Sequence, residues 1–401
     1  MNSQIMETTE QYVLHTYNRF PISIERGEGV RVRDADGREY LDFMSGIGVY
    51  ALGYHYPGYD EALIAQIGKV IHTSNLYYSE PLMDASKRLV KATGLSKVFF
   101  TNSGAEAIEG AIKSARKYAR TCGRDAYEVI AMEDSFHGRT VGALSVTGNE
   151  HYQEPFRPLM GGVRFAKFNQ IETVKECLSD KTCAILLETL QGEGGIYPAD
   201  PDFLKEIRRI ADERDIVLIL DEIQCGMGRT GTMWAFEQYG IMPDILTCAK
   251  ALGCGVPVGA FVLNEKLAGA SLVPGDHGTT YGGNPFVTAA AAKVLEIFEK
   301  DAIPERAAKM GQYLSAKLDK LAASHPVIKE HRGMGLMRGL MLDPACKAGD
   351  IASGALLRGL LIITAGGNVL RFLPPLIITE EEIDEAVEIL DGILQSYEKG
   401  E

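Results

Sequence analysis

A continuously apolar run, Ile216-Val217-Leu218-Ile219-Leu220, ends at the acidic residue Asp221. The run is rich in β-branched residues and shows no polar alternation, which is typical of a strand buried on both faces of a parallel sheet. In such sheets the ligand-binding groups stand at the carboxyl ends of the strands. Asp221 is therefore expected at a ligand-binding edge, although an aspartate that ends a strand is usually a cap or turn residue.

Strand-like runs alternate with helical patterns from about residue 97 to residue 263, which predicts an α/β sheet with helices on both faces. The other predicted strands are 97–101, 128–132, 183–187 and 259–263. A helical pattern after Pro201 fits a crossover between two strands, with one apolar face formed by Phe203, Ile207, Ile210 and Ala211. After about Lys300 the pattern changes to a long helix, strands near 331–342 and 369–373, and a final helix from Glu380 to about Tyr397.

The predicted strand 97–101 leads into Asn102-Ser103-Gly104-Ala105 and then into an amphipathic stretch. The apolar positions at helical spacing are Ala107, Ile108, Ala111, Ile112 and Ala115. Ser103 and Gly104 are thus expected at a helix N-terminus, where free N–H groups and the helix dipole favour a phosphate. An ordinary serine cap, with Glu106 completing a capping box, explains the same segment.

Lys250 follows another apolar stretch, in Leu246-Thr247-Cys248-Ala249-Lys250. A lysine that bonds covalently to an aldehyde cofactor needs a fixed reach and a lowered pKa, which burial and nearby positive charge provide. Pyridoxal phosphate also needs a carboxylate beside its ring nitrogen, a role that suits Asp221. A phosphate loop, an aspartate and a lysine in this chain order indicate a Schiff-base enzyme more specifically than any one of them.

From about Gly27 to its end the chain resembles the class III aminotransferases of fold type I. The segments that carry the resemblance are Leu41-Asp42-Phe43, Ala51-Leu52-Gly53, Ser135-Phe136-His137-Gly138-Arg139-Thr140, Gln191-Gly192-Glu193-Gly194-Gly195, Asp221-Glu222-Ile223-Gln224, Cys225-Gly226-Met227-Gly228-Arg229-Thr230-Gly231 and Gly278-Thr279-Thr280-Tyr281-Gly282-Gly283-Asn284-Pro285. Two further segments, 72–78 and 370–376, are more similar to the acetylornithine branch of that family than to its ornithine or 4-aminobutyrate branches.

The resemblance implies an α/β fold of the fold-type I PLP-dependent transferases. A large PLP-binding domain with a mostly parallel central sheet is expected at 57–300, and a smaller α+β domain at 1–56 and 301–401. Thr280 matches a hydroxyl that reaches the cofactor phosphate from the neighbouring subunit, so the resemblance also implies a homodimer.

The matching positions imply the cofactor site for pyridoxal 5'-phosphate, with Lys250 and Asp221 as its catalytic residues. The expected cofactor-binding residues are Ser103, Gly104, Ala105, Phe136, Asp221, Gln224, Lys250 and Thr280. Phe136 matches the aromatic that stacks on the ring, and Gln224 matches the group near the ring hydroxyl. Lys250 is expected to shuttle the proton, whereas His137 is interpreted as structural. Plainer explanations exist for single residues, such as core packing for Phe136.

The expected substrate-binding residues are Arg139, Glu193, Thr279 and Arg371, and no metal is expected. Planar guanidinium groups bind carboxylates bidentately, and Arg371 matches the residue that grips the α-carboxylate of glutamate. Glu193 matches a switch glutamate that pairs with Arg371 while the ω-amine substrate is bound. A surface salt bridge is the plainer explanation of either arginine.

The chain departs from the family pattern at Thr189-Leu190, Cys254 and Thr279. Of these residues only Thr279 is expected to touch substrate, so the preferred acyl group of the substrate stays open.

The implied reaction moves the δ-amino group of N2-acetylornithine to 2-oxoglutarate, in arginine biosynthesis. Ornithine, succinylornithine, acetyl-lysine-type or 4-aminobutyrate transamination remain alternatives, as do an aminomutase or racemase. A non-catalytic PLP-binding protein is the alternative of another class, and the joint presence of Lys250 and Asp221 counts against it.

Composition excludes several other classes of function. With 41 basic and 54 acidic residues the net charge is −13, which argues against nucleic-acid and anionic-membrane partners. The seven cysteines form no CxxC pair and, with no signal or membrane segment evident, predict reduced thiols in the cytoplasm. Gly46-Ile47-Gly48-Val49-Tyr50-Ala51 matches a dinucleotide fingerprint, but the acidic residue that should follow is missing, so a glycine turn is predicted. No nucleotide-triphosphatase or zinc-protease motif occurs.

Overall fold

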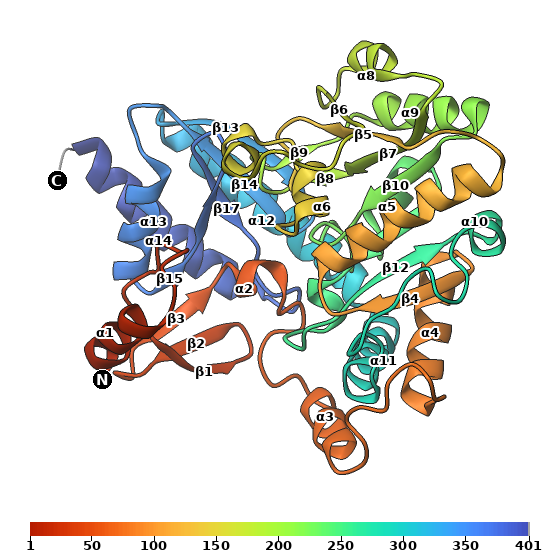
Figure 1. The fold of residues 1–401 in the computed structure, drawn as a ribbon. Helices are drawn as coiled ribbons and strands as arrows, with labels where there is room; N and C mark the ends of the chain where they lie inside the picture. The colour runs from red at the N-terminus through yellow and green to blue at the C-terminus, as the bar shows by residue number, and fades with distance from the viewer. Residues whose placement is uncertain (400–401) are drawn as a thin grey trace.

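A seven-stranded sheet occupies the centre of the larger part of the molecule (Figure 1). The structure, a computed structural model, describes residues 1–399. The strand order is β4 (Lys97–Thr101), β12 (Gly259–Leu263), β11 (Ile245–Cys248), β10 (Val217–Asp221), β7 (Thr182–Glu188), β5 (Glu128–Met132) and β6 (Val163–Ala166). All neighbours pair in parallel except β12, which is antiparallel to both β4 and β11. The predicted, mostly parallel sheet is confirmed.

Helices cover both faces of this sheet because successive strand residues point to opposite sides. On one face α5 (Gly104–Thr121), α6 (Val141–Ser145) and α10 (Glu265–Ala270) pack against a core that contains Val217 and Ile219. On the other face α9 (Pro201–Arg214), α4 (Glu80–Thr93) and α11 (Pro285–Lys300) pack against a core that contains Leu218 and Leu220. Every residue of β10 is buried, as its continuously apolar sequence predicts.

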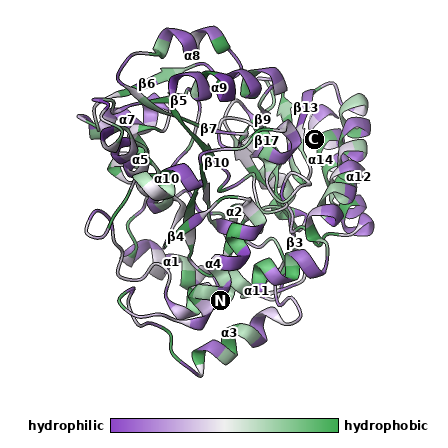
Figure 2. Ribbon diagram, turned by 90° about the vertical axis from the view of Figure 1, so that its right-hand side faces the viewer, coloured by the Kyte–Doolittle hydropathy of each residue, from purple (hydrophilic) through white to green (hydrophobic). Residues whose placement is uncertain are grey.

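The amphipathic helices bury the faces that their periodicity predicts. In α5 the buried positions include Ala107, Ile108, Ala111, Ile112 and Ala115. In α9 they include Phe203, Ile207, Ile210 and Ala211, and Pro201 stands in the first turn, where its missing N–H costs nothing. Figure 2 shows both hydrophobic and hydrophilic stretches along α9 and α12 (Ile303–Ser324), which lie on the outside of the molecule.

The two ends of the chain build two further sheets of four strands each. One has the order β1 (Ile24–Glu28), β2 (Arg31–Asp34), β3 (Glu39–Asp42) and β15 (Leu360–Leu361); the other has β13 (Ile328–Met334), β14 (Met337–Leu342), β17 (Val369–Phe372) and β16 (Ile363–Ala365). Because β15 pairs in parallel with β3, the C-terminal part completes the N-terminal sheet, and Figure 1 shows both parts together on the left. The division into domains at 57–300 and at 1–56 with 301–401 stays a prediction, and 400–401 lie outside the described residues.

The remaining elements surround these sheets. They are α1 (Asn2–Tyr12), α2 (Ser45–Gly48), α3 (Tyr59–Ile67), α7 (Glu150–Gln153), η1 (Glu154–Phe156), α8 (Ile171–Cys177), β8 (Leu190–Gln191), β9 (Tyr197–Pro198), η2 (Ala235–Tyr239), η3 (Lys250–Leu252), α13 (Ala348–Leu357) and α14 (Glu380–Lys399). The segment that matched a dinucleotide fingerprint is a glycine turn, as predicted: Gly46, Ile47 and Gly48 have φ of 60°, 67° and 77°. Among residues 1–399, no helix combines the length and the apolar character needed to span a bilayer.

Candidate active site

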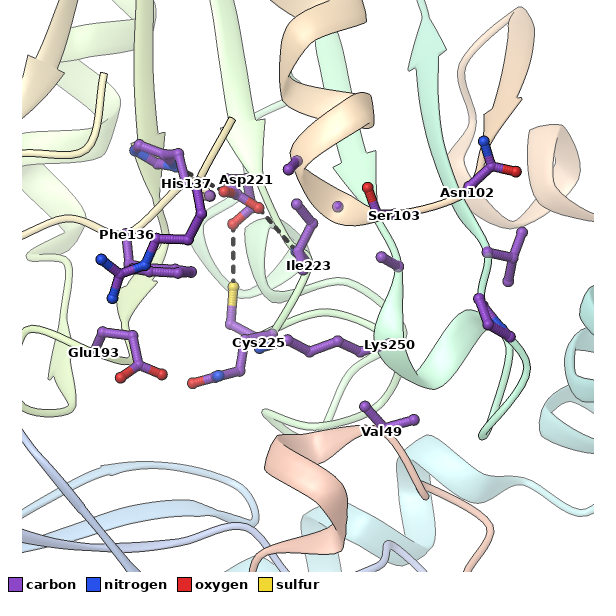
Figure 3. A pocket seen from close by; sticks show the side chains of 18 of the residues that line it. Val49, Asn102, Ser103, Phe136, His137, Glu193, Asp221, Ile223, Cys225 and Lys250 are labelled. Carbon is purple, nitrogen blue, oxygen red and sulfur yellow. Dashed lines mark hydrogen bonds and ion pairs between the residues drawn. The ribbon is translucent and has the colours of Figure 1, made fainter. Parts of the chain in front are cut away.

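The carboxyl ends of β7 and β10 meet at one edge of the central sheet, where Glu188 pairs in register with Asp221. A cavity of about 470 Å³ lies at this edge. Nine of the predicted site residues line it: Ser103, Gly104, Ala105, Phe136, Arg139, Glu193, Asp221, Gln224 and Lys250. Figure 3 shows Ser103 and Glu193 at opposite sides of the cavity, with Asp221 and Lys250 between them. The sheet topology therefore gathers residues that are far apart in the sequence.

Three donors hold the Asp221 carboxylate in place. Nδ1 of His137 lies 2.7 Å from Oδ2, and Oδ1 accepts hydrogen bonds from the backbone N–H of Ile223 at 3.0 Å and from the Thr247 hydroxyl at 3.2 Å. Burial disfavours the charged form of His137, but the hydrogen bond and charge of Asp221 outweigh it and raise the pKa of the imidazole. This hydrogen bond to Asp221 is consistent with the structural role expected for His137.

Lys250 follows β11 and extends its side chain into the cavity (Figure 3). Burial lowers the pKa of its ammonium group to about 8, and the positive charge of Arg371 acts in the same direction against the acidic neighbours Glu193 and Asp221. The predicted causes of a lowered pKa, burial and a nearby cation, are both present. An amine with this pKa exchanges protons readily near neutral pH.

The loop from β4 into α5 brings backbone donors to the other side of the cavity. Ser103 caps α5 by accepting a hydrogen bond from the N–H of Glu106 at 3.2 Å, while the Glu106 carboxylate accepts from the N–H of Asn102 at 2.8 Å. The alternative of a serine cap is therefore correct, with the carboxylate shifted by one residue from a standard capping box. The N–H groups of Gly104 and Ala105 in the first turn have no partner within the helix and remain free for an anion.

Aromatic and cationic side chains line the side of the cavity beside Glu193. The Arg139 guanidinium lies 5.3 Å from the centre of the Phe136 ring and 3.7 Å from that of Tyr152. The Phe136 and Tyr152 rings meet edge to face, with their centres 6.5 Å apart. Phe136 is thus a cavity-lining residue rather than a member of the packed core, and Arg139 is stacked rather than bound in a surface salt bridge.

Glu193 and Arg371 form an ion pair at 2.5 Å, with the Arg371 side chain only 3% exposed. Nη1 of Arg371 also donates to Oε1 of Gln224 at 3.3 Å, and its Nε is buried without a partner among the described residues. Burial favours the neutral form of Glu193, but the charge and hydrogen bond of Arg371 outweigh it and lower the pKa of the carboxyl. The structure therefore brings together the predicted switch pair.

Thr279 and Thr280 lie outside the Lys250 cavity. They line a neighbouring cavity of about 490 Å³ together with Asn102, which lines both. The Thr279 hydroxyl accepts hydrogen bonds from the Asn102 amide and from the N–H of Gly282, each at 3.1 Å. Within one chain these threonines do not reach the lysine, and the contact of Thr280 with a partner's site stays a prediction.

Glu188 is a cavity residue that the sequence prediction missed. Its carboxylate accepts hydrogen bonds from the N–H of Phe136 at 3.2 Å and of Gly192 at 3.3 Å, and burial raises its pKa to about 7. A usable signal existed, because Glu188 ends a buried apolar run as Asp221 does. Val256, Pro257 and Val258 also line the cavity, and no sequence signal pointed to them.

The residues around the cavity fit pyridoxal phosphate. The free N–H groups of α5 suit its phosphate, and the fixed carboxylate of Asp221 suits a protonated ring nitrogen. A Cβ atom on Gly104 would stand 2.8 Å from Cδ1 of Ile223, so the loop leaves no room for a side chain where the phosphate is expected. The part of the chain that the structure describes holds no cluster of three His, Cys, Asp or Glu side chains suited to a metal ion.

Comparisons with known proteins identify the family of this chain. The family model of aminotransferase class III matches residues 12–394. The acetylornithine aminotransferase of Methanocaldococcus jannaschii is 48% identical over 395 residues, which cover 98% of this chain and 98% of that protein. A structure of the Toxoplasma gondii ornithine aminotransferase, with partial occupancy of PLP at its active site, has a TM-score of 0.95 at 31% identity and covers 100% of this chain and 95% of that one. The N-acetylornithine aminotransferase from Stenotrophomonas maltophilia K279a has a TM-score of 0.84 at 36% identity, covering 99% of this chain and 100% of that one. The chain belongs to the class III aminotransferase family and has its fold-type I architecture.

Proposed function

We propose that this protein is a PLP-dependent aminotransferase that moves the δ-amino group of N2-acetylornithine to 2-oxoglutarate. The products are N-acetylglutamate 5-semialdehyde and glutamate, and the reaction belongs to arginine biosynthesis. The observation that carries the proposal is the placement of Lys250 in one cavity with Asp221 and Glu193, together with the ion pair that joins Glu193 to Arg371. The named relatives, at up to 48% identity over nearly the whole chain, support the choice of substrate.

The predicted cofactor-binding residues would have two roles: they would hold the cofactor, and one of them would transfer a proton. When bound, pyridoxal phosphate supplies an electron sink for the electron pair left at the substrate carbon. Lys250 would hold its aldehyde, the first turn of α5 its phosphate, Phe136 a face of its ring and Asp221 the ring nitrogen. Once the substrate amine has displaced it from the aldehyde, Lys250 would be a free amine with a pKa lowered to about 8, which can take a proton from the substrate carbon and return it near neutral pH.

The arginines explain how one cavity would accept two different substrates. Arg139, stacked on Tyr152 at the rim of the cavity, would bind the α-carboxylate of acetylornithine. Arg371 is neutralised by Glu193 in this arrangement, so it attracts no second carboxylate. When glutamate enters, Glu193 would leave Arg371, whose planar fork would then bind the α-carboxylate of glutamate.

Ornithine is the second candidate substrate, because a protein named ornithine aminotransferase has a TM-score of 0.95 with this chain. The test is formation of glutamate from 2-oxoglutarate with N2-acetylornithine, ornithine, N2-succinylornithine or 4-aminobutyrate as the amine donor. We expect kcat/KM for acetylornithine to exceed that for ornithine by at least about tenfold, the difference that one satisfied amide or one mismatched charge makes. A higher kcat/KM for ornithine would overturn the choice of substrate while leaving the aminotransferase assignment intact.

We also propose a homodimer. Leu76, Tyr77 and Tyr78 are 87%, 69% and 105% exposed, and exposed apolar side chains gathered in one segment are typical of an interface. The same surface continues to Tyr281, which is 62% exposed and whose ring centre lies 5.3 Å from that of His72. Tyr281 adjoins Thr280, so a second copy placed here would bring that threonine towards a partner's site.

A further inference from the structure

A second compartment adjoins the Lys250 cavity on the side of Glu193, which lines both. It has a volume of about 490 Å³. Its walls come from the turn after β5, from α7, from the β8–β9 loop and from the turn between β16 and β17. The side chains that line it include Asp134, Asn149, Tyr152, Tyr197 and Thr364. None of these residues has a part in the amine chemistry proposed above.

The compartment is joined to the substrate-binding arginine through Tyr152. This tyrosine lines the compartment, while the guanidinium of Arg139 lies 3.7 Å from its ring centre and lines the Lys250 cavity. A substrate carboxylate on Arg139 therefore brings its own α-carbon to the border between the two cavities. In an N-acylated ω-amino acid that carbon also bears the acylated nitrogen, and the compartment is the space beside it.

We infer that this compartment receives the N-acyl group of the substrate and that Asp134 selects neutral acyl groups over those that end in a carboxylate. The inference rests on the proposed function and deepens it, because it concerns which acylated ornithine is preferred.

The polar groups of the compartment suit a neutral amide. Asn149 begins α7 without using its side chain as a cap, so its amide is available to both the carbonyl and the N–H of an acyl group. The tyrosine and threonine hydroxyls add further donors and acceptors. No lysine, arginine or histidine lines the compartment, and its acidic residues are Asp134 and Glu193. Since Glu193 is paired with Arg371, Asp134 is the lining carboxylate without an ion pair among the described residues.

The backbone of Asp134 is held by close contacts, so its exposed side chain starts from a set place at the compartment. Its N–H donates to the carbonyl of Gly148 at 2.7 Å, and its own carbonyl would lie 2.5 Å from a Cβ atom on Gly194. The opposite wall is held by the hydrogen bond from the N–H of Gly366 to the carbonyl of Glu193, at 2.9 Å. A carboxylate carried into this space by a succinyl group therefore meets the like charge of Asp134.

The first test compares kcat/KM for N2-acetylornithine and N2-succinylornithine in the wild-type holoenzyme, in Asp134→Asn and in Glu133→Gln. Glu133 is the matched control, because it is the adjacent exposed carboxylate and does not line the compartment. We expect the wild type to prefer the acetyl substrate by at least about tenfold, and Asp134→Asn to raise kcat/KM for the succinyl substrate about fivefold relative to that for the acetyl substrate. An unchanged preference in Asp134→Asn, or the same gain in Glu133→Gln, would overturn the selective role of Asp134.

The second test fills the compartment with Thr364→Phe, because phenylalanine suits a strand and Thr364 is the exposed middle residue of β16. The reaction with glutamate, which carries no acyl group, serves as the reference. We expect kcat/KM for acetylornithine to fall at least about fivefold while the glutamate value stays within about twofold. If Thr364→Phe had the same kcat/KM as the wild type for each of the two substrates, the acyl group would have to bind elsewhere. A wild type that processes glutamate but not acetylornithine would overturn the proposed substrate, and the acyl inference with it.

Discussion

Lys250 adopts a backbone conformation that lysine rarely occupies. Its φ of 47° lies in the left-handed region, which costs an ordinary residue on the order of 1 kcal/mol or more. Hydrogen bonds from the N–H groups of Gly253 and Cys254 to the Lys250 carbonyl, at 3.0 and 3.2 Å, hold this turn. The chain thus tolerates local strain at the residue whose amine needs a fixed direction into the cavity.

Arg371→Lys separates the charge of this side chain from its shape. Lysine keeps the charge but lacks the planar fork that binds a carboxylate through two hydrogen bonds. We expect kcat/KM for glutamate to fall at least about tenfold and that for acetylornithine to stay within about threefold. The two half-reactions, measured separately by stopped-flow absorbance, give both values. Arg358→Lys, an exposed position in the same part of the chain, is the control, and equal losses for both substrates would contradict the switch.

Glu188 makes stability depend on pH. Burial raises its folded-state pKa from an ordinary 4.5 to about 7, so the folded protein binds a proton that the unfolded chain has already released. The stability linked to this group is complete below pH 4.5 and is lost as pH rises through 7. A shift of this size corresponds to roughly 3 kcal/mol as an upper bound.

Urea unfolding of the wild type and Glu188→Gln at pH 5 and pH 8 checks this linkage. We expect the wild type to lose more unfolding free energy than the variant between these two pH values, by up to roughly 3 kcal/mol. Parallel pH profiles for the two proteins would mean that Glu188 does not titrate in this range.

At the scale of elements, continuous apolar runs predicted the central strands well. The strands at 97–101, 128–132 and 259–263 have the predicted bounds, because a strand buried on both faces leaves little ambiguity in its sequence. The sheet that joins β3 to β15 was not predicted, since β15 has only two residues and its partner lies more than 300 residues earlier. Such pairings depend on tertiary structure rather than on local pattern.

Sequence motifs predicted which residues belong to the candidate site, but the contacts between those residues became visible only in the structure. The order of Ser103, Asp221 and Lys250 along the chain, with the family resemblance, predicted a cofactor site, and all three line one cavity because parallel strands present their carboxyl ends at one edge. The stacking of Arg139 on Tyr152 could not be predicted, since it joins a loop to a helix of four residues. Glu188 was missed although it has the same strand-end position as Asp221.

The N-terminus of α5 lies at the Lys250 cavity, so we expect Gly104→Ala to weaken cofactor binding. The added methyl group would stand 2.8 Å from Cδ1 of Ile223, so either the loop or that side chain must move within the cavity. We expect the Kd for pyridoxal phosphate to rise at least about fivefold and stability to fall by about 1–3 kcal/mol. Gly269→Ala in α10 is the control, because nothing lies within 4 Å of its added Cβ atom. Cofactor titration and urea unfolding measure both effects, and wild-type affinity in Gly104→Ala would contradict the assignment of this loop.

At the scale of the whole molecule, the site combines distant parts of the chain. Lys250 and Asp221 come from the central sheet, whereas Arg371 belongs to β17 in a sheet formed by C-terminal residues. The residues proposed for amine chemistry and for recognition of glutamate therefore belong to different parts of the fold, and the Glu193–Arg371 ion pair links them.

The proposed dimer predicts that charge placed on the exposed apolar segment breaks the assembly. Tyr78→Glu would bury a carboxylate without a partner, so we expect a monomer and a fall in kcat of at least about tenfold, since Thr280 would no longer reach a partner's site. Leu357→Glu, at a side chain that is 71% exposed on another surface, is the control and should stay dimeric. Light scattering gives the mass, and a fully active monomer would refute a cofactor site shared between subunits.

The most direct measurement of the central claim is the visible absorption spectrum of the protein with pyridoxal phosphate, for the wild type and for Lys250→Ala. N2-acetylornithine, ornithine, 4-aminobutyrate and glutamate are added separately. We predict that the wild type shows the absorption of lysine-bound cofactor and that acetylornithine and glutamate abolish it rapidly, whereas the other amines act slowly. Lys250→Ala should lack that band and turn over at least about a thousandfold more slowly. A wild-type protein whose band responds to none of these amines, or a Lys250→Ala variant with full activity, would contradict the assignment.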